Sequence, residues 1–132
     1  MTPMTQDWQE LGRLLLAEAW AADAYGTLAG QLGGRAGERL YRLAREARSR
    51  AACLKGICLL MTGTAPQIPP IPPEPGTPQT ILRRSYGKAL GMLGRYEARQ
   101  GDPEYGPVFR QLAAQQQAHC YTLLELMGTL PP

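Results

Sequence analysis

The sequence has 132 residues, of which 44% are hydrophobic and 19% are charged, and its formal net charge is +3. This length predicts one domain over residues 1–132, and no apolar run is long enough to cross a bilayer. The small positive charge is too mild to indicate nucleic-acid binding, so we do not expect that partner. Leu, Ala, Arg and Gln are abundant while β-branched residues are scarce, which favours an all-α fold.

The cysteines and the N-terminus bear on the compartment. The first ten residues lack a basic segment followed by an apolar stretch, so we expect no signal peptide. The three cysteines are an odd number, and Cys53 and Cys58 point in different directions on one predicted helix. We therefore expect Cys53, Cys58 and Cys120 to be free thiols in a reducing cytoplasm.

Four helices are predicted, with local signals at their ends. Thr5 is expected to cap the first helix, and Thr77 is an N-cap followed by Pro78 at the first helical position. Pro107 leaves the start of the fourth helix open by one turn. Glycines are expected to end the helices: Gly33-Gly34, Gly63, Gly101 and Gly128. The predicted helices cover about residues 5–32, 35–62, 78–100 and 104–127.

Along each predicted helix, apolar residues recur at alternating steps of three and four, which is typical of a four-helix bundle. Residues 64–77 separate the two helical pairs, and seven prolines between Pro66 and Pro78 exclude helix there. Such a polyproline chain spans ~45 Å, against ~38 Å for a helix of ~25 residues, so it is long enough to cross over the bundle. We expect two antiparallel hairpins with the second and third helices parallel. The alternative is a flexible linker between separable hairpins, each of which would have to dimerise.

The first two helices differ in charge. The first is mostly acidic, whereas the second carries a basic stripe, which we interpret as a solvated face paired with the acidic helix. Contact with phosphate backbones is a further alternative, although no helix-turn-helix, zinc finger or interleaved aromatic residues accompany the stripe. The stripe consists of Arg35, Arg39, Arg42, Arg45 and Arg48.

Polar residues interrupt the apolar pattern near the middle of three helices. They are Glu18, Arg50, and the pair Gln116 and His119. A bundle core seldom buries a lone charge, because the charge loses its hydration without compensation. These residues therefore predict one polar layer across the bundle.

The arrangement of these positions resembles that of the rubrerythrin and ferritin-like superfamily. That family has two helical hairpins, a long crossover and a di-iron site built from one Glu on each of two helices and Glu-x-x-His on each of the other two. Glu18 is followed by Tyr25 after seven residues, and Ala89 by Tyr96 at the same interval. Two segments resemble the Glu-x-x-His motifs: Ala47-Arg48-Ser49-Arg50 and Gln116-Gln117-Ala118-His119.

The resemblance implies six ligand positions, and this chain departs from the family at most of them. Four carboxylates and two imidazoles are implied, but the chain supplies one carboxylate, one imidazole and one amide. Two irons need carboxylate charge to offset their own, so we expect no metal and no other cofactor. The alternatives are iron or another divalent metal at a divergent site, including a single ion near His119 and Glu18. The six ligand positions that the resemblance implies are Glu18, Ala47, Arg50, Ala89, Gln116 and His119.

We expect an ion pair between Glu18 and Arg50 in place of the metal layer. The alternative is that Arg50 leans to the bundle surface and Glu18 stays partly hydrated. The supporting polar residues are expected to be Gln116, His119, Tyr25 and Tyr96.

The function we expect is that of a structural or interaction protein derived from a di-iron fold, acting as a homodimer or with a protein partner. Trp20, which lies off the apolar seam, is a candidate dimer contact. The rival hypothesis is a metal-binding, rubrerythrin-like oxidoreductase.

Overall fold

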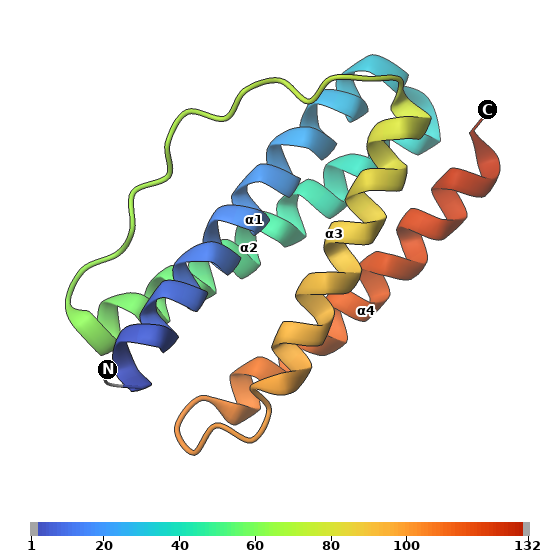
Figure 1. Cartoon of the computed structure of the whole chain (residues 1–132). Coiled ribbons are helices and arrows are strands. Elements are labelled where there is room, and N and C mark those ends of the chain that lie inside the picture. Colours follow the sequence, from blue (N-terminus) through green and yellow to red (C-terminus); the bar gives the residue numbers. More distant parts are fainter. Residues whose placement is uncertain (1–2, 131–132) are drawn as a thin grey trace. The chain divides into compact units, whose positions relative to one another are not determined.

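The computed structural model describes the backbone of residues 3–130 and the side chains of residues 8–130. This part of the chain is all-α and contains no strand (Figure 1). Its helices are α1 (Pro3–Leu32), α2 (Gly34–Thr62), α3 (Pro78–Ala98) and α4 (Gly106–Thr129). The all-α class and the four helices are thus confirmed.

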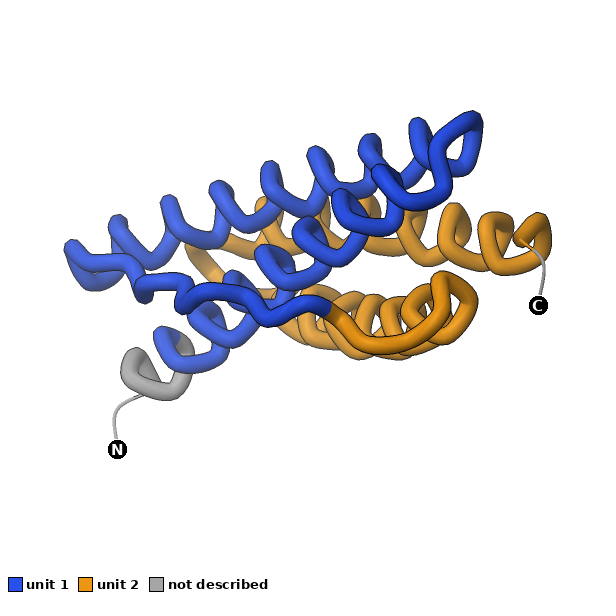
Figure 2. The backbone as a smooth tube through the Cα atoms, turned by 90° about the horizontal axis from the view of Figure 1, so that it is seen from above, with its two compact units in different colours: residues 1–73 blue, residues 74–132 orange. Residues whose placement is uncertain are grey.

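The helices form two compact units, Met1–Pro73 and Glu74–Pro132, which Figure 2 shows in different colours. In the first unit α1 packs against α2, and in the second α3 packs against α4. Each unit is an antiparallel hairpin, as the two pairs of helical segments predict (Figure 1). The parallel course of the second and third helices and the single domain over 1–132 stay predictions.

A one-residue turn joins α1 to α2. Gly33 and Gly34 have φ values of 62° and 60°, in the left-handed region that glycine adopts most readily. The Gly33 N–H donates to the Ala29 carbonyl at 3.0 Å and ends α1, whereas Gly34 already belongs to α2. Beyond the turn the helices approach closely, since a Cβ at Gly37 would lie 2.9 Å from the Ala29 carbonyl oxygen.

The predicted end of α2 and the predicted connection are confirmed. Gly63 has φ 79°, and its N–H donates to the Leu59 carbonyl at 2.9 Å. Residues 64–75 then contain neither helix nor strand. This connection starts against α1, because a Cβ at Gly12 would lie 3.5 Å from Pro66 Cγ.

The predicted start of α3 is also confirmed. The Thr77 hydroxyl accepts a hydrogen bond from the Thr80 backbone N–H at 3.2 Å, and Pro78 occupies the first turn. This cap is a local feature that two consecutive residue types encode, Thr77 and Pro78, which is why the sequence was sufficient to locate it.

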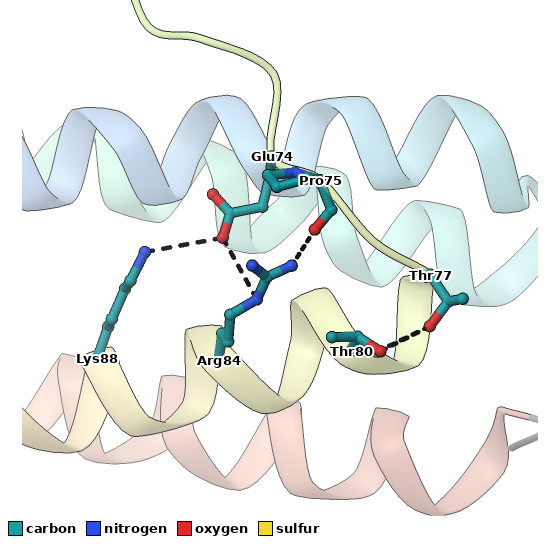
Figure 3. Close-up of polar contacts among 6 residues, drawn as sticks. All are labelled: Glu74, Pro75, Thr77, Thr80, Arg84 and Lys88. Atoms are coloured by element: carbon teal, nitrogen blue, oxygen red, sulfur yellow. Dashed lines mark hydrogen bonds and ion pairs between the residues drawn. The ribbon is translucent and has the colours of Figure 1, made fainter.

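The chain just before the cap is held onto α3 by charged side chains (Figure 3). The Glu74 carboxylate lies 3.8 Å from Arg84 Nε and 3.7 Å from Lys88 Nζ. The Arg84 guanidinium also donates to the Pro75 carbonyl. These contacts fix the approach of the proline-rich connection to the second hairpin.

Three predicted helix ends were wrong. Since α1 begins at Pro3, Thr5 lies inside it and is not its N-cap. Since α3 ends at Ala98, Gly101 is not its terminator. Gly128 lies inside α4, which continues until Leu130 turns to an extended conformation, because a glycine can keep helical angles and only weakens the helix.

The turn between α3 and α4 explains the early end of α3. The Asp102 carboxylate accepts hydrogen bonds from the backbone N–H groups of Glu104 at 2.9 Å and Tyr105 at 2.7 Å. An Asp that binds the backbone ahead of it favours a turn over a helix. The Arg99 guanidinium stacks over the Phe109 ring, 4.9 Å from its centroid, and ties the turn to the first turns of α4.

Candidate functional site

A buried ion pair joins the middle of α1 to the middle of α2. Arg50 Nε donates to Glu18 Oε2 at 2.7 Å, and both side chains have 0% of their surface exposed. This short distance is typical of a charge-assisted hydrogen bond. The sequence-based expectation of an ion pair thus agrees with the structure, and the alternative of an Arg50 that leans to the surface does not.

The pair depends on the register of the two helices. Glu18 and Arg50 are 32 residues apart, and the tight turn at Gly33 places them at similar distances from the end of the hairpin. Ala47 lies one helical turn before Arg50 and is fully buried as well. Tyr25, two turns after Glu18, is 1% exposed. The polar pair therefore sits in an otherwise apolar seam.

The second hairpin has a neutral polar contact at its corresponding positions. Gln116 Nε2 in α4 donates to the Ala89 carbonyl of α3 at 3.2 Å. Gln116 Oε1 is buried and has no hydrogen-bond partner within the described chain. His119 is 1% exposed one turn further along α4, and Tyr96 of α3 is fully buried. The structure thus brings Gln116 and Ala89 together in one hairpin and Glu18 and Arg50 in the other, while the single layer shared by both hairpins stays a prediction.

The six positions do not fit a di-iron centre. Ala47 and Ala89 carry no donor atom, and a guanidinium stands at position 50 where the resemblance implies an imidazole. Glu18 already uses one carboxylate oxygen for that guanidinium. Among the described residues, no three His, Cys, Asp or Glu side chains gather where they could share a metal ion.

The cysteines are placed as small core residues rather than as reactive thiols. Cys58 is buried and Cys53 is half-buried, and neither forms a disulfide. Burial raises the pKa of both thiols above the ordinary value. A raised pKa keeps a thiol protonated, and the protonated form is a poor nucleophile and metal ligand.

Comparison with protein families, with curated proteins and with solved structures gives no match. The resemblance to rubrerythrins therefore depends on the sequence features alone. None of the four helices combines the length and the apolar character that a bilayer span requires, as judged over the described residues.

Sequence reasoning missed two residues that shape the hairpins. Gly37 was not singled out, although the close approach of Ala29 leaves no room for a side chain there. Asp102 was not singled out either, although the Asp-Pro pair at 102–103 is a turn signal. The bond from Gln116 to the backbone of Ala89 had no sequence signal, because any residue supplies that carbonyl.

Proposed function

We propose that this chain is a structural or interaction protein of ferritin-like descent, in which a buried ion pair stands where metal ligands once stood. The observation that carries the proposal is the 2.7 Å contact between Arg50 Nε and Glu18 Oε2 in the interior of the first hairpin.

The electrostatics of this pair argue against metal chemistry at the same place. Two divalent or trivalent irons require several carboxylates, whereas Glu18 and Arg50 together have no net charge. At short range in a weakly polarisable interior, a guanidinium repels a second cation strongly. The guanidinium itself can organise the polar residues around it through its fixed fork of donors.

Association is the second part of the proposal. Trp20 is 39% exposed on α1, and large exposed aromatic side chains are enriched in protein interfaces. The expected assembly is a homodimer or a complex with another protein.

Metal analysis of the full chain, purified without chelator and measured by inductively coupled plasma mass spectrometry, tests the first part. We expect far less than one metal ion per chain. Stoichiometric iron, manganese or zinc would overturn the proposal and support the rival, a metal-binding oxidoreductase with a divergent site. Sedimentation equilibrium tests the association, and a Trp20→Ser variant should weaken a dimer that uses this side chain.

Restoring the implied metal ligands tests whether the chain descends from a di-iron protein. In a variant with Ala47→Glu, Arg50→His, Ala89→Glu and Gln116→Glu, the chain again has the carboxylates and imidazoles that the resemblance implies. We expect this variant to bind Co²⁺ with a visible d–d spectrum, and the unmodified chain to show none. If the restored variant folds, as judged by circular dichroism, and still binds no metal, the positions were not inherited from a di-iron site.

A further inference from the structure

The outer face of α2 carries five exposed cationic side chains, which we call the α2 cationic face: Arg35, Arg42, Arg45, Arg48 and Lys55. No salt bridge or hydrogen bond holds any of these five side chains within the described part of the chain. The sequence predicts that the acidic helix pairs with a basic stripe that contains Arg39 in place of Lys55, but Glu18 of that helix binds the buried Arg50. For Arg35, Arg42, Arg45 and Arg48 no such ion pair forms within the described part of the chain, and all five side chains of the face are exposed. Arg48 also reaches α1, where its guanidinium lies 3.6 Å from a Cβ built at Gly26.

The charges form a long and nearly uninterrupted track. From residue 35 to residue 55 a helix rises ~30 Å, a length that nine or so phosphates of one strand with stacked bases would cover at ~3.4 Å each. Glu38 is the one exposed carboxylate of α2. Cations spread along a rigid helix are complementary to a polyanion, and binding would release the counterions that the polyanion holds.

The chemistry of the face favours phosphate groups and bases. Four of its five cations are Arg, whose planar fork binds phosphate oxygens in a bidentate manner. Tyr41 lies on the same face and is 47% exposed. Its hydroxyl oxygen is 3.8 Å from a Cβ built at Gly30, so the ring leans over α1 and leaves about half its surface open. A partly exposed aromatic ring beside Arg side chains is a stacking site for an unpaired base.

The same helix is poorly suited to a membrane surface. An interfacial helix inserts its apolar face among the acyl chains. In α2 that face is buried in the first hairpin, where Leu40, Leu43 and Leu54 are 0–2% exposed.

We propose that the α2 cationic face binds the phosphate backbone of single-stranded nucleic acid, with Tyr41 as the stacking side chain. This interaction uses a different surface from the buried ion pair and does not depend on the metal content of the chain.

Fluorescence anisotropy of the full chain with a fluorescein-labelled, single-stranded 20-nucleotide DNA tests the proposal between 50 and 200 mM NaCl. Five phosphate contacts predict that log K falls with log salt with a slope of about −3.5. The variant with Arg42→Gln, Arg45→Gln and Arg48→Gln should bind about 100-fold more weakly at 0.1 M salt, because each lost contact costs about fivefold.

A matched variant, with Arg83→Gln, Arg95→Gln and Arg110→Gln, removes the same charge from exposed arginines of α3 and α4. It should change the affinity by less than about threefold, because these side chains are outside the track. Tyr41→Ala should weaken binding by about fivefold or more, and Tyr41→Phe should not. All of these positions are exposed, and circular dichroism will verify that each variant is folded.

Three outcomes would overturn the proposal. The first is no anisotropy change at 50 mM salt with about 100 μM protein, a concentration at which even non-specific binding is measurable. The second is an equal loss in both triple variants, which would indicate a general charge effect. The third is binding to phosphatidylserine vesicles without binding to the oligonucleotide, which would assign the face to a lipid surface.

Discussion

The two hairpins place polar groups at comparable points of their seams but satisfy them differently. In the first, a carboxylate and a guanidinium meet at 2.7 Å with no exposed surface. In the second, an amide donates to a backbone carbonyl at 3.2 Å. A buried ion pair is sensitive to the loss of either partner, because a lone charge remains, whereas a neutral contact leaves little behind. The difference predicts that the first hairpin depends far more on its polar residues than the second.

The largest expected effect is at Arg50. Arg50→Ala leaves the buried Glu18 carboxylate without its cation, and we expect the free energy of unfolding to fall by about 3–5 kcal/mol. Urea denaturation followed by circular dichroism measures it. As a matched control, Arg50→Met combined with Glu18→Leu removes both charges and should be far less destabilising, or even stabilising. A fall of less than about 1 kcal/mol for Arg50→Ala would contradict the role of the pair.

Replacing glycine by alanine should have opposite effects on the stability at Gly37 of α2 and at three exposed glycines of α3. Gly37→Ala in the first hairpin places a Cβ 2.9 Å from the Ala29 carbonyl oxygen, so we expect a loss of about 1–3 kcal/mol. Gly87, Gly91 and Gly94 of α3 are exposed, and nothing lies within 4 Å of a Cβ at any of them. Each of these changed to Ala should raise the stability by about 0.5–1 kcal/mol, because alanine is the better helix former. Thermal unfolding of the four single variants measures these changes in stability. A stabilising Gly37→Ala would contradict the close approach of α1 and α2 at this position.

A smaller effect is expected at the turn of the second hairpin. Asp102→Ala removes a side chain that holds two backbone N–H groups and should cost about 1 kcal/mol near neutral pH.

The Asp102 contribution should also depend on pH. The backbone N–H of Tyr105, followed by that of Glu104, lowers the pKa of Asp102 below its ordinary value of 3.8. A lowered pKa in the folded state means that the contribution is present above pH 3.8 and is lost as the pH falls through the folded-state pKa. The difference in unfolding free energy between the unmodified chain and Asp102→Ala should therefore shrink between pH 6 and pH 3. A difference that does not change would contradict the assignment.

The smallest effect is expected at Gln116. Gln116→Leu removes the bond to the Ala89 carbonyl, but it also removes the buried Oε1 that has no partner within the described chain. The two changes oppose each other, so we expect a shift of less than about 1 kcal/mol in urea denaturation. A loss as large as that of Arg50→Ala would mean that the two hairpins do not differ in the proposed way.

The features that sequence analysis located correctly are short and local. The cap at Thr77-Pro78 and the left-handed Gly63 each involve residue types within one helical turn. The errors occurred where local signals compete. Glycine is common at helix ends, and Gly101 and Gly128 were therefore predicted to end their helices. The turn held by Asp102 ends α3 before Gly101, whereas α4 continues through Gly128.

The sequence by itself determined that this protein consists of four helices in two hairpins joined by a proline-rich segment, because apolar spacing, caps and prolines act over a few residues. Only the tertiary structure decided that Arg50 points inward to Glu18 while Arg45 and Arg48 of the same helix stay exposed. Arg48 and Arg50 are the same residue type two positions apart, and a helix turns about 200° between them. Which of the two is buried depends on how α2 is rotated against α1, and packing of the whole seam sets that rotation.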